Sequence, residues 1–137
     1  MNRGNSLLVF AILLLPGCDS GESAAAAAAR DFLDAHYVRI DLAAAKGLST
    51  GLATEKVGEE IRLVGGVVPD SEAMKPRIHY RREKVWKEAE NDATYAYVLT
   101  VTPPGSAAFH KRVLVTVRRV EEGWKVSNYR ESDVSAP

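Results

Sequence analysis

The chain has 137 residues, and its 18 basic and 18 acidic side chains give a formal net charge of zero. This balance gives no indication of nucleic-acid binding, which requires a strongly basic face. The single cysteine, Cys18, excludes an internal disulfide, so a hydrophobic core has to stabilise the fold. The histidines His36, His79 and His110 are too far apart in sequence to predict a metal site. No glycine-rich phosphate loop is present, so we expect no cofactor.

Residues 1–17 have the features of an export signal. Arg3 is the one charged residue before an unbroken apolar run, Leu7 to Leu15. The run is shorter than the roughly 20 apolar residues that cross a bilayer, so it predicts a signal peptide and not a transmembrane helix. Without Arg3, the remaining chain of residues 18–137 carries 17 basic and 18 acidic side chains, which is a nearly neutral domain.

The end of this signal, Leu15-Pro16-Gly17-Cys18, resembles the lipobox of bacterial lipoproteins. The resemblance implies that diacylglycerol is attached to the Cys18 thiol and that cleavage leaves Cys18 as an acylated N-terminus. Acyl chains hold a protein on a membrane, here on the periplasmic side of the cell envelope. Asp19 resembles the residue that retains such lipoproteins in the inner membrane. The alternative is an exported protein with a free or intermolecularly bonded cysteine.

The mature chain predicts one domain with helices first and strands second. Residues 18–23 form a short lipidated tether, residues 24–133 the domain and residues 134–137 a tail. Three helices are expected: one from Ala24, capped by Ser23; a short one after Asp41; and one from about Leu52. Apolar side chains at helical spacing mark their buried faces. These side chains are Phe32, Leu33, His36, Tyr37 and Ile40 in the first helix, and Ala53, Val57, Ile61 and Val64 in the third.

After Pro76 the apolar period changes from helical to two, which predicts four strands over residues 78–87, 93–101, 109–120 and 124–131. A phase shift between Tyr80 and Val85 indicates a bulge in the first strand. Short turns join the strands into an antiparallel meander whose apolar face the helices must cover. We therefore expect an α+β fold, with N-terminal helices packed on a curved four-stranded antiparallel sheet.

The opposite face of this sheet is predicted to be half apolar and partly basic. Its side chains would be Val98, Thr100, Arg112, Leu114, Thr116, Arg118, Lys125 and Tyr129. Such a face suits a protein partner or self-association. The alternative is an ordinary solvated sheet face.

Helices followed by a meander resemble the nuclear-transport-factor-2-like (NTF2-like), or cystatin-like cone, superfamily. The resemblance covers residues 24–133, and the stretches that carry it are "AARDFLDAHYVRIDLAAAKGLS" and "GWKVSNYRESD". It implies a cone whose mouth holds a small ligand. The superfamily includes isomerases, dehydratases, transport adaptors and modules without known activity, so the fold does not determine the function.

If the cone forms, a candidate pocket would be lined by His36, Tyr37, Tyr95, Tyr97 and Trp124. A histidine among aromatic walls can act as a general base or contact a ligand. No carboxylate is evident to orient its ring, because the helical phase of Asp34 and Asp41 points them outward. The alternative is a core histidine bonded to a tyrosine, and no residue is assigned a catalytic role.

The stretch "GLSTG", Gly47 to Gly51, matches the G-x-S-x-G elbow of hydrolases but follows a helix instead of a strand, which favours a helix–helix loop. The sequence therefore predicts a lipid-anchored envelope protein that acts as a non-enzymatic ligand-binding or protein-interaction module. The alternative is a small pocket enzyme of isomerase or dehydratase type that uses His36 as general base.

Overall fold

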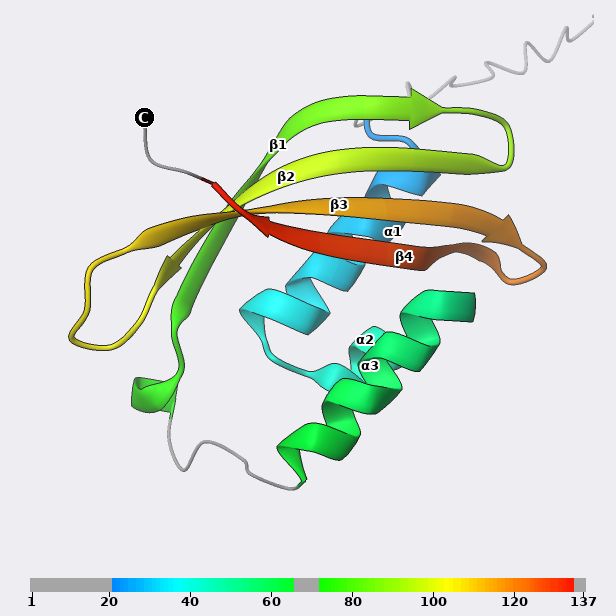
Figure 1. Cartoon of the computed structure of the whole chain (residues 1–137). Helices are drawn as coiled ribbons and strands as arrows, with labels where there is room; N and C mark the ends of the chain where they lie inside the picture. The colour runs from blue at the N-terminus through cyan, green and yellow to red at the C-terminus, as the bar shows by residue number, and fades with distance from the viewer. Residues whose placement is uncertain (1–20, 66–71, 135–137) are drawn as a thin grey trace, which may run out of the picture.

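The computed structural model describes residues 21–65 and 72–134. The described residues form three α-helices followed by a four-stranded antiparallel sheet (Figure 1), which confirms the predicted fold class. The predicted signal peptide, Cys18 and most of the tail lie outside the described residues. The elements, in chain order, are α1 (Ala24–Leu33), a π-helical turn η1 (Asp34–Val38), α2 (Leu42–Gly47), α3 (Gly51–Val64), a 3-10 turn η2 (Glu72–Met74), β1 (Arg77–Glu88), β2 (Asp92–Thr102), β3 (Phe109–Val120) and β4 (Gly123–Asp133).

The helix starts follow the predicted caps. The Ser23 hydroxyl accepts a hydrogen bond from the Ala26 amide at the start of α1, and the Asp41 carboxylate accepts one from the Ala44 amide at the start of α2. Each side chain satisfies an amide that has no partner inside its own helix. The alanines of α1 that face the sheet have almost no exposed surface. Their small side chains let α1 pack closely on β2, β3 and β4.

The predicted first helix changes its winding before it ends. Residues Asp34–Val38 form a π-helical turn, in which the Arg39 amide donates to the Asp34 carbonyl over 2.8 Å. This wider turn buries three consecutive residues, Ala35, His36 and Tyr37, which a regular α-helix does not place on one face. The chain then reverses at Ile40, whose φ of 54° is left-handed and strained for a β-branched residue.

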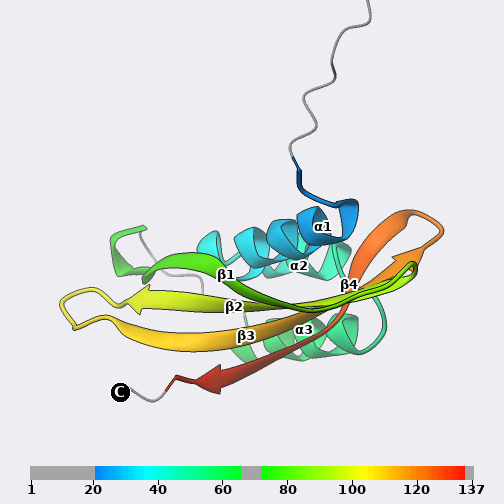
Figure 2. The same cartoon turned by 90° about the horizontal axis from the view of Figure 1, so that it is seen from above.

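The sheet has the order β1-β2-β3-β4, so β1 and β4 are its edges. Figures 1 and 2 show its strong twist and the helices packed against it. The pairing of β1 with β2 shifts register between Arg82 and Lys84, inside the region where the bulge was predicted. A second shift follows between Val85 and Lys87. These bulges twist β1 and leave most of it exposed to solvent.

One residue of β4 faces the opposite side from the one predicted. Val126 pairs with Val117 while Asn128 pairs with Thr116, so Ser127 is an extra residue in β4. Such a bulge moves the following side chains to the other face. Tyr129 was expected on the outer face and instead lies in the core, with 5% of its surface exposed.

Candidate functional site

The π-helical turn carries His36 into an aromatic cluster. Its ring centroid lies 5.3 Å from that of Phe32, 4.3 Å from that of Tyr37 and 5.0 Å from that of Tyr129. Only 7% of the His36 surface is exposed. Because α1, η1 and β4 all contribute to the cluster, the π-helical turn and the β4 bulge together place these rings.

A carboxylate does orient the imidazole, contrary to the sequence-based expectation. His36 Nε2 donates to Glu60 Oε2 of α3 over 2.6 Å, and the Tyr129 hydroxyl donates to the other Glu60 oxygen. Glu60 follows Val57 by three residues and so lies on the same side of α3. That spacing was the available signal. Glu60 lies 24 residues from His36, whereas the nearest acids in sequence, Asp34 and Asp41, do not contact the ring.

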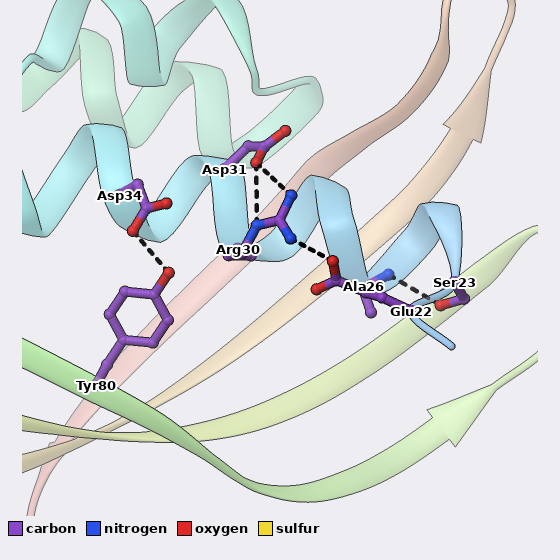
Figure 3. Close-up of polar contacts among 7 residues, drawn as sticks. All are labelled: Glu22, Ser23, Ala26, Arg30, Asp31, Asp34 and Tyr80. Carbon is purple, nitrogen blue, oxygen red and sulfur yellow. Dashed lines mark hydrogen bonds and ion pairs between the residues drawn. The ribbon is translucent and has the colours of Figure 1, made fainter. Parts of the chain in front are cut away.

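Asp34 also differs from the expectation. Its carboxylate lies toward the sheet and accepts a hydrogen bond from the Tyr80 hydroxyl of β1 over 2.6 Å (Figure 3). Burial and this hydrogen bond raise the pKa of Tyr80 above its usual value. Asp41 remains exposed as a helix cap, as expected. Neither of these two carboxylates contacts His36.

The charge on Glu60 is stabilised by its neighbours. Partial burial raises its pKa, but the hydrogen bonds from His36 and Tyr129 and the nearby Lys56 ammonium outweigh burial, so the net pKa lies below the ordinary value. The Lys56 ammonium lies 5.3 Å from the centre of the Tyr129 ring and donates to the Tyr129 carbonyl. A charged Glu60 keeps Nε2 of His36 in its protonated, donating form.

A second tyrosine–carboxylate pair lies beside the first. The Tyr37 hydroxyl donates to Glu131 Oε1 over 2.6 Å, and Lys111 donates to the other Glu131 oxygen. Burial, followed by the bond to Glu131, raises the pKa of Tyr37 far above its usual range. Tyr37 therefore stays protonated and acts as a hydrogen-bond donor, not as a base.

A groove of about 370 Å³ opens next to this cluster. Its walls are almost wholly apolar, apart from His36, Tyr37 and Glu60 at one side. The apolar wall is formed by Ile40, Leu42, Leu63, Val64 and Ile78. Leu63 and Val64, at the end of α3, are 69% and 46% exposed. Of the predicted apolar face of α3, Ala53 and Val57 are buried in the core. Ile61 is exposed instead, and Val64 lines the groove together with Leu63, which was not predicted on that face.

The structure separates the five predicted pocket residues into three hollows. His36 and Tyr37 line the groove at the end of α3, and Tyr97 lines a hollow beside β1. Tyr95 and Trp124 line a third hollow at the start of α1. Between them, tightly packed side chains such as Phe32, Leu33, Leu99 and Val113 fill the interior of the cone.

Within residues 21–65 and 72–134, no three metal-ligating side chains come together. None of the helices described is long and apolar enough to cross a membrane. Ser49 is buried, and its hydroxyl donates to the Lys46 carbonyl in a helix–helix loop, as its sequence context predicted.

The lowered pKa of Glu60 predicts that its contribution to the free energy of unfolding depends on pH. Its pKa is lowered on folding, so this contribution is complete above the unfolded-state pKa and is lost as the pH falls through the folded-state pKa. We expect Glu60→Gln to cost about 1 kcal/mol near neutral pH. It should also flatten the loss of unfolding free energy as the pH falls below the ordinary glutamate pKa of 4.5. Denaturant titrations at each pH measure both effects. Glu55→Gln, an exposed acid on the same helix, is the control. Equal pH profiles for wild type and Glu60→Gln would contradict the assignment.

Comparison with known proteins agrees with the fold. No protein-family model matches the sequence, and no curated protein sequence matches it. Among solved structures, a ketosteroid isomerase-like protein from Erwinia carotovora atroseptica superposes with a TM-score of 0.60 at 19% identity, over 82% of this chain and 95% of that one. The VirB8 protein of Agrobacterium tumefaciens has a TM-score of 0.61 at 13% identity, over 89% of this chain and 99% of VirB8.

An NTF-2 like protein of unknown function from Shewanella oneidensis gives a TM-score of 0.57 at 9% identity, over 78% of this chain and 94% of that one. At such identities the likeness shows the fold and not the activity. The described domain therefore has the cone fold of NTF2-like proteins.

Proposed function

We propose that this chain is a lipid-anchored bacterial envelope protein whose domain is a non-enzymatic binding module facing the periplasm. The anchor is proposed from Leu15-Pro16-Gly17-Cys18, and Asp19 favours the inner membrane. The binding role is carried by one observation, the open apolar groove at the end of α3 beside a filled cone. The ligand class is an apolar or amphipathic group, with its polar end toward Tyr37 and Glu60.

The position of the groove suits this role. α1 begins close to the tether, and η1 ends at the groove, so the two sites are separated by the length of residues 24–38. At 1.5 Å per residue that is about 20 Å. With Cys18 attached to the membrane, the groove would lie about one helix length from the tether. The strained backbone at Ile40, which lines the groove, supports a functional role for this corner.

The alternative is a small enzyme of isomerase or dehydratase type with His36 as general base. The bond from Glu60 favours it, because an oriented imidazole is what a general base needs. Two observations favour binding instead. Nε2 of His36 is already bonded to Glu60, and Nδ1 has no exposed surface and no partner. A substrate therefore reaches neither nitrogen unless α3 moves away from η1.

The outer sheet face remains a second proposed surface, for a protein partner or self-association. Leu114, Val98 and Thr116 are half-buried there. Arg112 on this face is tied to Glu83 by two hydrogen bonds, which leaves less free positive charge than the sequence suggested. The apolar groove is therefore the better supported binding site.

Photo-crosslinking in intact cells compares the two surfaces. A photoreactive phenylalanine analogue replaces Leu63 in the groove or Thr116 on the outer face. We expect a covalent adduct, identified by mass spectrometry, from position 63 and not from position 116. An adduct confined to position 116 would contradict the groove assignment. Failure at both positions would contradict a binding role for either surface. Loss of a catalytic activity in a correctly folded His36→Gln variant would instead favour the alternative, a small enzyme with His36 as general base.

A further inference from the structure

The exposed edge strand β1 lies beside the tether. Gly21 and Glu22 line a hollow of about 350 Å³ together with Arg30, Arg82 and Tyr97. The Ser23 hydroxyl lies 3.3 Å from that of Tyr95, on the neighbouring strand β2. Only Asp19 and Ser20 separate Gly21 from Cys18, so their Cα atoms are at most about 11 Å apart.

The basic side chains near this hollow fall into two groups. Arg30 is held by Glu22 and Asp31, as Figure 3 shows, and Lys87 is paired with Asp92. By contrast, Arg81, Arg82 and Lys84 form no ion pair within the described residues. The acid next to them in β1, Glu83, is bonded to Arg112 instead. These three side chains therefore present positive charge that is available to an external anion.

Trp86 accompanies these charges. It lies at the second bulge of β1 with 60% of its surface exposed, and the Lys84 ammonium lies 4.8 Å from the centre of its ring. Lysines and bulges on an edge strand are explained by protection against strand pairing. An exposed tryptophan is not explained in this way. A tryptophan beside basic side chains is typical of a surface that meets the boundary between lipid headgroups and acyl chains.

We propose that Arg81, Arg82, Lys84 and Trp86, the β1 docking edge, bind the anionic headgroup surface of the membrane that anchors the chain. The inference rests on the proposed anchor at Cys18, because the anchor brings this edge within reach of the bilayer. The phosphates of acidic phospholipids complement the unpaired basic side chains. The Tyr97 hydroxyl adds a donor at the mouth of the hollow.

Acidic side chains near the hairpin between β1 and β2 restrict the expected lipid contact to one part of β1. Glu88 accepts a hydrogen bond from Tyr95, and Glu90 lines the adjoining hollow with Trp124. Both would be repelled by anionic lipid. The contact is therefore expected along Arg81–Trp86 and not at the hairpin between β1 and β2.

The test uses residues 19–137 without lipid, since every contact that the structure describes lies within residues 21–134. Vesicles of phosphatidylcholine are compared with vesicles that also contain phosphatidylglycerol, at low and high salt. We expect sedimentation only with phosphatidylglycerol at low salt. Arg82→Gln and Lys84→Gln should each weaken partitioning about 5-fold. In a Trp124→Phe background, Trp86 emission should shift to shorter wavelength on binding.

The control is Arg130→Gln, an exposed basic residue on the opposite edge strand β4. It should leave partitioning unchanged. Equal loss in Arg130→Gln would mean a response to net charge, and absence of binding to phosphatidylglycerol would mean that no docking edge exists; either result overturns the proposal. Displacement by inorganic phosphate at equal ionic strength would show a free-phosphate site and would also overturn it. Because the protein in this test is not lipidated, its outcome does not depend on acylation of Cys18.

Discussion

Replacing Phe32 by alanine is expected to lower the free energy of unfolding by about 3–5 kcal/mol. Phe32 has no exposed surface, and its ring packs on His36 and on Tyr129, at centroid distances of 5.3 Å and 5.1 Å. The substitution leaves a cavity where α1, η1 and β4 meet. Because domains of this size are stable by about 5–15 kcal/mol, the loss removes a large share of the total. Urea denaturation followed by circular dichroism measures it.

Phe109→Ala provides the matched control, since Phe109 starts β3 and 43% of its surface is exposed. The same chemical change there should cost well under half as much, because little apolar surface leaves the core. Similar losses from the two substitutions would mean that the aromatic cluster around His36 is not a packed part of the core.

Replacing Cys18 by alanine is expected to abolish fatty-acid attachment entirely. The thiol of a lipobox cysteine is the group to which diacylglycerol is attached, and the chain has no other cysteine. Acyl chains contribute roughly 0.8 kcal/mol per buried methylene, so two or more of them account for stable anchoring. Growth with an alkyne-tagged fatty acid, followed by fluorescent coupling, measures attachment. The mass of the mature N-terminal peptide reports cleavage before Cys18.

The control for this prediction is Ser20→Ala, which changes the tether and leaves Cys18 intact. It should retain the label. Label that persists in Cys18→Ala, or a wild-type protein that carries no label, would remove the basis for the anchor. A membrane association that survives without label but is released by high salt would then be explained by the β1 docking edge.

Local sequence signals predicted the elements well. Ser23 and Asp41 cap the helices that they were expected to cap, and the alternation of Val113, Val115 and Val117 places these residues in the core. Caps and periodicity act between neighbours in the chain, so they can be interpreted without knowing the fold. Because a meander joins strands through short turns, the strand order also followed directly.

The candidate site depended on contacts that local signals do not contain. Glu60 meets His36 across 24 residues and Tyr129 across 69. The spacing of Glu60 from Val57 indicates the side of α3 on which it lies, but it identifies neither partner. The π-helical turn and the extra residue Ser127 in β4 each change which side chains face inward. Both irregularities bring large aromatic rings together in one core, so packing between elements selects them against local regularity.

The sequence by itself therefore determined the class of fold, the order of its elements and, through Leu15-Pro16-Gly17-Cys18, the prediction of a lipid anchor. Tertiary structure alone decided that side chains fill the cone and that Glu60 accepts the hydrogen bond from Nε2 of His36. It also decided that the second half of α3 opens as a groove. The physical reason is that hydrophobic periodicity indicates which face of each helix or strand is buried. Which side chains then meet on that face depends on how the elements pack.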